Sequence, residues 1–406
     1  MRAIFVDINM PKVIATKVLE RIWPGVHYSR ISPAQFADLP DPPLPGPRWI
    51  RVENRLCGIC ASDLHILFVD ADPGIHPVAL PGFQRIYLGH EVVSRVVEVG
   101  PRVTRLRTGD RVVMQSRFMG PTCFSQEIEP VCRHCTQGNY ALCENQSAGV
   151  GPRGVGGGWG DGYTAHETEV WRVPDDLSDD QAVLVEPLAV GLHAVLRRPP
   201  QPGEKLLIVG SGIIGLTTLQ AARALCPDCH ITAIARYPYQ QETARKLGAD
   251  EVVRSEDPYP RVAEITGAKL YRGQFGNCTL LGGFDVVYDC VGSSRTLQDS
   301  LRWTRAGGTL LLIGTSLNRL KVDLTPVWHQ EVDVIGAIAH GVETWQGERV
   351  STFDLVARLL REGRLTHEGL ITHRFPLEQW RDAIEVATHK RRYRSIKVVF
   401  DYSLDS

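Results

Sequence analysis

The stretch that decides the fold of this chain runs from Lys205 to Leu225 and reads KLLIVGSGIIGLTTLQAARAL. Its first five residues form an apolar run of strand length, and the residues after Gly215 have the periodicity of a helix. The pattern G-x-G-x-x-G lies between the two. In such a unit the first glycine permits a tight turn, the second lets the backbone approach a pyrophosphate, and the third allows close packing of helix and strand. The free N–H groups at the helix N-terminus favour the anion. The predicted dinucleotide-binding residues here are Gly210, Ser211, Gly212, Ile213, Ile214 and Gly215.

Strands and helices alternate along the chain after this loop. We predict further strands at 230–235, 284–290, 309–313 and 332–338, with helices at 239–247 and 294–303 between them. Such alternation is typical of a parallel, doubly wound α/β sheet. We therefore expect a Rossmann dinucleotide-binding domain over residues 186–344.

The residues before this domain have a different pattern. Short β-rich runs, such as 49–52, 92–99 and 111–114, are separated by turn residues, and five prolines between 40 and 47 exclude a helix there. These runs predict an antiparallel, barrel-like domain over residues 1–185. Residues 345–406 lack the α/β alternation, and we expect them to return to the first domain.

The composition limits the classes of protein. The chain has 406 residues, of which 43% are hydrophobic and 22% charged, with a net charge of −1. This balance is ordinary for a globular protein and gives no basic surface for nucleic acid or for an anionic membrane. The apolar runs are too short for a spanning helix, and Asp7 interrupts the N-terminal one before a signal segment could form. We expect a cytoplasmic protein.

Six of the ten cysteines fall between residues 57 and 143, which favours metal binding over disulfides in a chain without an export signal. Cys132, Cys135 and Cys143 have a spacing that suits one tetrahedral zinc in a lobe at 120–150. Cys123 is the favoured fourth ligand, because structural sites prefer thiolate, and Glu129 is the alternative. A set of free or redox-active thiols is the competing interpretation.

A second constellation reads Cys57-Gly-Ile-Cys60-Ala-Ser62-Asp63-Leu-His65 and is followed by Gly89-His90-Glu91. Together with the cysteine lobe and the glycine-rich loop, it resembles the zinc-dependent medium-chain alcohol and polyol dehydrogenases. The resemblance extends over nearly the whole chain in the family's order. The stretch VEPLAVG at 185–191 is similar to the sorbitol, threonine and glucose dehydrogenase branch. It implies a GroES-like barrel beside the Rossmann domain.

The resemblance also implies roles for individual residues. Cys60, His90 and Glu186 are expected to bind a catalytic zinc, with Glu91 as an outer or exchanging ligand. Asp63 would orient the histidine. Ser62 would contact the substrate oxygen, and His65 would relay its proton or else be a surface histidine.

The implied reaction is hydride transfer between a secondary alcohol or polyol and a nicotinamide cofactor. The family position that reads the ribose falls on Ala235, and an acid there would favour NAD. Alanine followed by Arg236 predicts NADP instead, with NAD as the alternative. A threonine-type dehydrogenase, a non-catalytic NADP-binding protein and a thiol redox sensor are the competing functions. We expect a homodimer or homotetramer with a small-molecule substrate.

Overall fold

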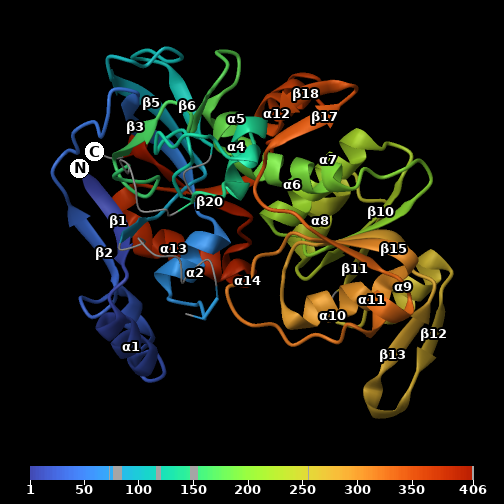
Figure 1. The fold of residues 1–406 in the computed structure, drawn as a ribbon. Helices are drawn as coiled ribbons and strands as arrows, with labels where there is room; N and C mark the ends of the chain where they lie inside the picture. Colours follow the sequence, from blue (N-terminus) through green and yellow to red (C-terminus); the bar gives the residue numbers. More distant parts are fainter. Residues whose placement is uncertain (73, 76–84, 116–119, 147–153, 255, 405–406) are drawn as a thin grey trace. The chain divides into compact units, whose positions relative to one another are not determined.

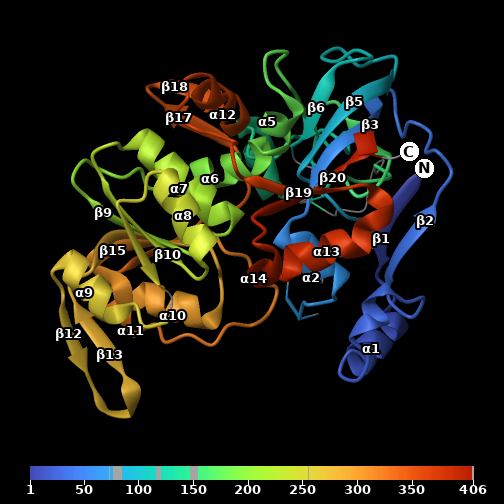
Figure 2. The ribbon, with the colours of Figure 1, turned by 180° about the vertical axis from the view of Figure 1, so that it is seen from behind.

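The computed structural model describes residues 1–406 except 73, 76–84, 116–119, 147–153, 255 and 405–406. The chain forms two compact units (Figures 1 and 2). The first comprises Met1–Glu186 and Leu370–Ser406, and the second comprises Pro187–Gly369.

The second unit is built on a parallel sheet with the strand order β11-β10-β9-β14-β15-β16. Every neighbouring pair in it is parallel. With its strands numbered along the chain, the sheet has the dinucleotide-binding order 3-2-1-4-5-6, so the predicted doubly wound sheet is confirmed. Its strands are β9 (Lys205–Val209), β10 (His230–Ala235), β11 (Glu251–Arg254), β14 (Phe284–Asp289), β15 (Thr304–Leu312) and β16 (Asp333–Gly336).

Helices cover this sheet, which explains why Leu206, Leu207 and Ile208 of β9 are all fully buried. Helix α7 packs on β9 and β10, and α10 packs on β14 and β15. The helices are α6 (Val185–Arg197), which begins in the first unit, α7 (Ile213–Leu225), α8 (Pro238–Lys246), α9 (Tyr259–Thr266), α10 (Ser294–Trp303), α11 (Thr325–His329) and α12 (Thr352–Arg361). The second unit also contains two antiparallel hairpins. One pairs β12 (Lys269–Arg272) with β13 (Cys278–Leu281), and the other pairs β17 (Val342–Trp345) with β18 (Glu348–Ser351).

The first unit contains the predicted antiparallel strands. The larger sheet has the order β19-β20-β3-β5-β6-β8, with β7 also on β3, and only the β19–β20 pair is parallel. Its strands are β3 (Trp49–Gly58), β5 (Val92–Val99), β6 (Arg111–Met114), β7 (Gly162–His166), β8 (Val170–Arg172), β19 (Ile371–Phe375) and β20 (Lys397–Asp401). Along β3, buried Val52, Asn54 and Leu56 alternate with exposed Glu53 and Arg55, which places one face on the core.

A smaller antiparallel sheet has the order β2-β1-β4, with β1 (Arg2–Asp7), β2 (Ala34–Asp38) and β4 (Arg85–Tyr87). The helices of this unit are α1 (Met10–Leu19), α2 (Ala61–Leu67), α4 (Arg133–Gln137), α5 (Asp179–Val183), α13 (Trp380–Thr388) and α14 (Lys390–Tyr393). The sequence analysis assigned strands to this half and did not predict α1. In both views α1 extends away from β1 and β2 (Figures 1 and 2).

The return to the first unit begins at Leu370, whereas the sequence interpretation placed it at residue 345. The intervening β17, β18 and α12 are bonded within the second unit. Thr352 donates to the carbonyl of Gly341 at 2.8 Å, and the Thr366 N–H donates to Gln220 Oε1 on α7 at 2.8 Å. Segment 345–369 therefore packs with the nucleotide-binding sheet.

Candidate active site

The loop after β9 has the geometry that its glycines predict. Gly210 has φ of 92°, and a Cβ on Gly215 would lie 1.7 Å from the Gly210 carbonyl oxygen, so neither position accepts a side chain without strain. The space around a Cβ at Gly212 is open to 4 Å. Gly212 is also the N-cap of α7 and makes no side-chain capping bond. The helix therefore begins at an open cradle suited to a pyrophosphate.

The two residues at the end of β10 differ in exposure. Ala235 is fully buried, and Arg236 is exposed, with its guanidinium 5.5 Å from the centre of the Tyr237 ring. Ser211 donates from its hydroxyl to the Ile234 carbonyl at 3.1 Å, which ties the glycine loop to this strand. The end of β10 therefore presents a cation next to the loop and no carboxylate at residues 235–236.

Residues from two separate parts of the first unit meet at a second centre. Cys60 precedes α2, and His90 and Glu91 precede β5. One ligand atom from each of these three residues lies within 4.8 Å of the other two. A thiolate, an imidazole and a carboxylate at this separation are the donors that zinc prefers.

Asp63 on α2 fixes the orientation of His90. Asp63 Oδ1 accepts from the backbone N–H of Gly89 at 2.9 Å and lies 3.3 Å from His90 Nδ1. Burial disfavours the charged imidazole, but Asp63 and Cys60 outweigh it and raise the pKa of His90 well above its usual value. Because Asp63 holds Nδ1, a metal ligand from this ring would be Nε2.

Lys397 on β20 is a member of this centre that the sequence analysis did not identify. Its Nζ donates to Glu91 Oε2 at 2.5 Å and to the Ile59 carbonyl at 3.2 Å. Both charged side chains are almost completely buried. Gly58 makes room for the pair, because a Cβ there would lie 2.1 Å from Glu91 Oε2. Glu91 Oε1 is buried without a hydrogen-bond partner among the described residues, so it can still accept a ligand.

Glu186, at the start of α6, is buried within electrostatic reach of the same residues. Burial raises the pKa of its carboxyl to about 7, His90 and Lys397 oppose the rise, and Glu91 adds to it. Lys390 is a second cation that sequence reasoning missed. Burial lowers its pKa, Lys397 lowers it further, and Cys60 opposes them. The carboxylates of Glu91 and Glu186, with the Cys60 sulfur and the His90 ring, offer donors suited to a divalent cation.

Ser62 and His65 both lie on α2, three residues apart and hence on one face. The Ser62 hydroxyl donates to Cys60 Sγ at 3.2 Å. His65 Nδ1 lies 2.8 Å from Asp70 Oδ2, and its side chain is partly exposed. Ser62 is thus next to the centre, and His65 pairs with the partly exposed carboxylate of Asp70.

The cysteine lobe brings its four thiols together. One sulfur from each of Cys123, Cys132, Cys135 and Cys143 lies within 4.8 Å of the others, and Glu129 is not part of this group. Backbone N–H groups point at the sulfurs, for example Cys132 N to Cys123 Sγ at 3.4 Å. A bond from Cys135 lowers the pKa of Cys143 to about 5. Residues 147–150 of the predicted lobe lie outside the described residues.

Comparisons with known proteins agree with this geometry. Residues 46–175 match the family model of the alcohol dehydrogenase GroES-like domain, and residues 214–353 match that of the zinc-binding dehydrogenases. L-idonate 5-dehydrogenase of Vitis vinifera is 32% identical over 361 residues, which cover 88% of each chain. The chain belongs to the zinc-dependent medium-chain alcohol and polyol dehydrogenases. This family is an oxidoreductase family, so the enzyme assignment made from the sequence is confirmed.

Other relatives of this dehydrogenase are also named as dehydrogenases of polyols or alcohols. Sorbitol dehydrogenase of Arabidopsis thaliana is 30% identical over 370 residues, covering 88% of this chain and 90% of the relative. The crystal structure of 2R,3R-butanediol dehydrogenase from Bacillus subtilis superposes with a TM-score of 0.69 at 26% identity, over 91% of this chain and 96% of that one. In the described part of the dehydrogenase, none of the helices has the length and apolarity that crossing a bilayer requires.

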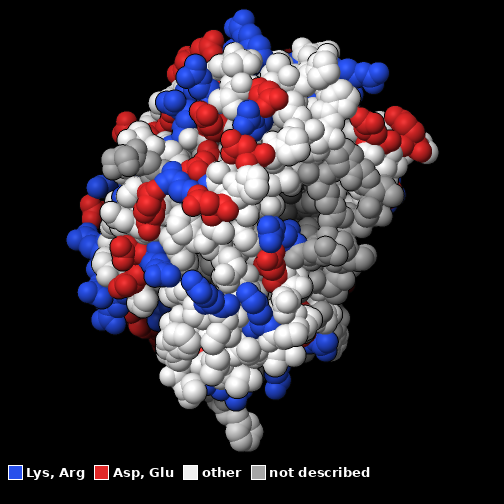
Figure 3. All heavy atoms as spheres, turned by 90° about the vertical axis from the view of Figure 1, so that its left-hand side faces the viewer, with Lys and Arg blue, Asp and Glu red and all other residues white. Residues whose placement is uncertain are grey.

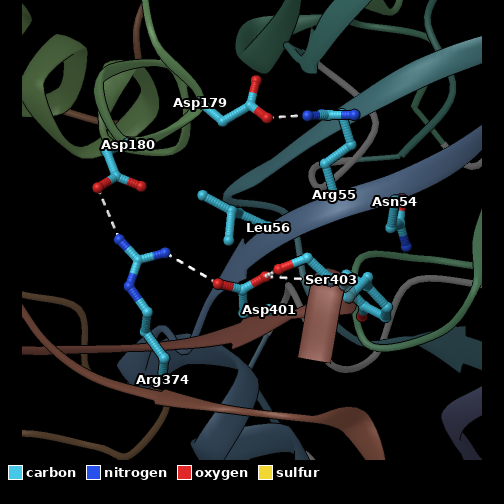
Figure 4. Close-up of a pocket in the computed structure, with 9 residues that line it drawn as sticks. Asn54, Arg55, Leu56, Asp179, Asp180, Arg374, Asp401 and Ser403 are labelled. Carbon is cyan, nitrogen blue, oxygen red and sulfur yellow. Dashed lines mark hydrogen bonds and ion pairs between the residues drawn. The ribbon is translucent and has the colours of Figure 1, made fainter. Parts of the chain in front are cut away.

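A separate polar pocket of about 340 Å³ opens in the first unit of the dehydrogenase (Figure 4). Arg374 joins Asp180 at 2.6 Å and Asp401 at 3.0 Å across it, and Arg55 pairs with Asp179 at 2.5 Å. None of the predicted site residues lines this pocket. Its paired charges connect α5 with β3, β19 and β20.

Proposed function

We propose that this dehydrogenase oxidises a secondary alcohol or polyol reversibly to the ketone, with NADP as the hydride acceptor and zinc at the centre formed by Cys60, His90, Glu91 and Glu186. The observation that carries the proposal is the convergence of Cys60, His90 and Glu91 within 4.8 Å, beside buried Glu186. The names of the relatives, which include idonate, sorbitol and butanediol dehydrogenases, support a hydroxylated substrate.

The donor set fits a catalytic zinc. Cys60, His90 Nε2 and Glu186 supply one sulfur, one nitrogen and one oxygen, which leaves a fourth tetrahedral position for substrate. The unpartnered Glu91 Oε1 makes Glu91 the candidate for an exchanging ligand. A second zinc would have a complete set of four thiolates, from Cys123, Cys132, Cys135 and Cys143. We prefer Cys123 to Glu129 as the fourth ligand, because Glu129 is not part of this group.

When bound, zinc would polarise the alcohol oxygen and the nicotinamide would accept the hydride. Asp63 would hold His90 in the ligating tautomer through its contacts with Nδ1 and with the Gly89 N–H. The Ser62 hydroxyl, 3.2 Å from the Cys60 sulfur, would contact the substrate hydroxyl and take its proton. His65, paired with Asp70, would pass a proton to solvent.

The proposed preference for NADP rests on the end of β10. The fully buried Ala235 places no negative charge near a ribose 2′-phosphate, and exposed Arg236 can grip that phosphate with its guanidinium. One charge-assisted contact of about 1.5–3 kcal/mol corresponds to roughly 10- to 100-fold discrimination. Measuring kcat/KM for both cofactors tests this, and Arg236→Ala should lose most of the preference. Equal efficiencies in the wild type would refute it.

The reaction itself is tested by a panel of secondary alcohols, polyols and L-threonine, followed by nicotinamide absorbance at known zinc content. We expect turnover with polyols, and a loss of turnover and zinc in Glu186→Gln. A matched control is Glu129→Gln, which alters a carboxylate outside both cysteine and histidine groups. Turnover with L-threonine alone would favour the amino-alcohol branch, and binding of NADP without turnover of any substrate would favour a non-catalytic role.

A further inference from the structure

Helix α1 and the turn after it present an apolar row to solvent. Met10, Ile14, Val18 and Ile22 follow one another at intervals of four residues, and the last three are 58%, 63% and 81% exposed. The turn continues the helical direction, since the N–H of Ile22 donates to the Leu19 carbonyl at 3.0 Å. Residues four apart in a helix lie on one face, so the four side chains form a continuous stripe.

The polarity of this helix is the reverse of that of an ordinary surface helix. Its one fully buried side chain among Met10–Leu19 is the polar Thr16, while the outermost side chains are aliphatic. Ile8 and Trp23 extend the apolar surface at the two ends of the stripe. On the face drawn in Figure 3, uncharged side chains predominate in the lower part, where α1 lies. A contiguous apolar patch of this kind marks an interaction site.

We propose that α1 is a subunit interface, covered in solution by α1 of a second copy of this chain in an antiparallel pair. The family models match from residue 46 onward, so this surface is not part of the domains that define the family. The proposal is independent of the proposed reaction, because none of its residues belongs to the site.

The first argument for a second copy is area. Six partly exposed apolar side chains present roughly 600 Å² per subunit, at about 200 Å² for a fully exposed residue of this size. Two such surfaces bury about 1,200 Å², which reaches the lower limit of stable protein interfaces. An isologous contact of this kind closes on itself as a dimer.

The second argument is that the apolar rows of two copies are complementary when the helices pack antiparallel. An antiparallel register that places Ile14 opposite Val18 of the partner subunit also places Met10 opposite Ile22 of the partner subunit. Both pairs are symmetric about Thr16, so one register places all four apolar residues of the row opposite one another. The register therefore buries the whole apolar row in one symmetric contact.

The test measures the molar mass of the zinc-loaded full chain and of its variants by size-exclusion chromatography with light scattering. Ile14→Glu combined with Val18→Glu should halve the mass of the wild-type assembly, with turnover per chain unchanged. Leu404→Glu, at a site of similar exposure (49%), should leave the mass unchanged. A wild-type monomer, or an unchanged mass in the double variant, overturns the proposal.

A second measurement is independent of how well the charged variant folds. A chain with Met10→Cys mixed with a chain with Ile22→Cys should form a disulfide-linked pair on mild oxidation, whereas neither variant should do so alone. Cross-linking of each variant with itself, or none in the mixture, overturns the antiparallel register. Co-sedimentation of a wild-type monomer with phosphatidylserine vesicles would identify a lipid surface as the occupant instead.

Discussion

Replacing Lys397 with methionine removes the cation from a completely buried ion pair. In the wild type, its Nζ lies 2.5 Å from Glu91 Oε2, and the two side chains are 1% and 0% exposed. Burial opposes the lysine charge, but Glu91 and Cys60 outweigh it and raise the pKa of Lys397. The variant would leave the Glu91 carboxylate without its cation, close to the Cys60 sulfur. Breaking a buried pair in this way costs about 3–5 kcal/mol of folding free energy.

The expected loss of stability is larger than the loss expected for an ion pair at the surface. For a unit of this size, about 2–4 °C of Tm corresponds to each kcal/mol, so the first unit should melt roughly 6–20 °C lower. Adding Glu91→Gln should recover part of the loss, with a coupling of about 2–3 kcal/mol between the two sites. The matched control is Lys246→Met, which removes an exposed lysine 2.8 Å from Glu242 and should cost less than about 1 kcal/mol.

The assay is urea unfolding of zinc-saturated protein, with zinc content measured on the same samples so that metal loss is not mistaken for a lost ion pair. All four members of the Lys397–Glu91 cycle are needed. Additive losses in the double variant, or a cost for Lys397→Met no larger than that of Lys246→Met, would refute the reasoning.

Further predictions concern protons and metal. Burial lowers the pKa of His166 to about 4, so the unfolded chain binds a proton near pH 6.5 while the folded one does not; stability should be complete above pH 6.5 and fall by about 3 kcal/mol toward pH 4. His166→Phe should flatten that slope in unfolding experiments at each pH. Because the pKa of Glu186 in the metal-free centre is about 7, zinc binding to the apoenzyme should weaken as pH falls below 7, and calorimetry in two buffers should detect the released proton. A mild chelator should remove one zinc together with turnover, while the four-thiolate zinc stays; turnover that survives loss of the first zinc contradicts the assignment of the centre.

The nucleotide-binding half could be predicted from the sequence because its rules are local. The helix at 294–303 has the predicted bounds, and the one predicted at 239–247 differs from α8 by one residue at each end, since apolar periodicity and turn residues decide them. Cys60, His90 and Cys132 could be identified from spacing and resemblance. The role proposed for Glu186 came from the resemblance alone.

Two features could not be predicted from local patterns. Lys397 stands in an apolar strand 306 residues from Glu91, and only the β20–β3 pairing brings its side chain to the centre. Helix α1 has a regular apolar period, but its buried residue is Thr16, so the pattern does not show which face meets the protein. Only tertiary contacts determine where Lys397 lies and which face of α1 is buried.

The pairing of β20 with β3 has a consequence for the order of biosynthesis. A ribosome makes the Cys60, His90 and Glu186 segments long before it makes Lys397, and domains fold as the chain emerges. Until β20 emerges, the nascent first unit holds a buried Glu91 without its cation and an incomplete sheet edge at β3. The Rossmann unit is synthesised between the two segments of the first unit, so it can fold before the first unit is complete. Loading of metal at the Cys60 centre is therefore expected to be among the last steps in the maturation of each molecule.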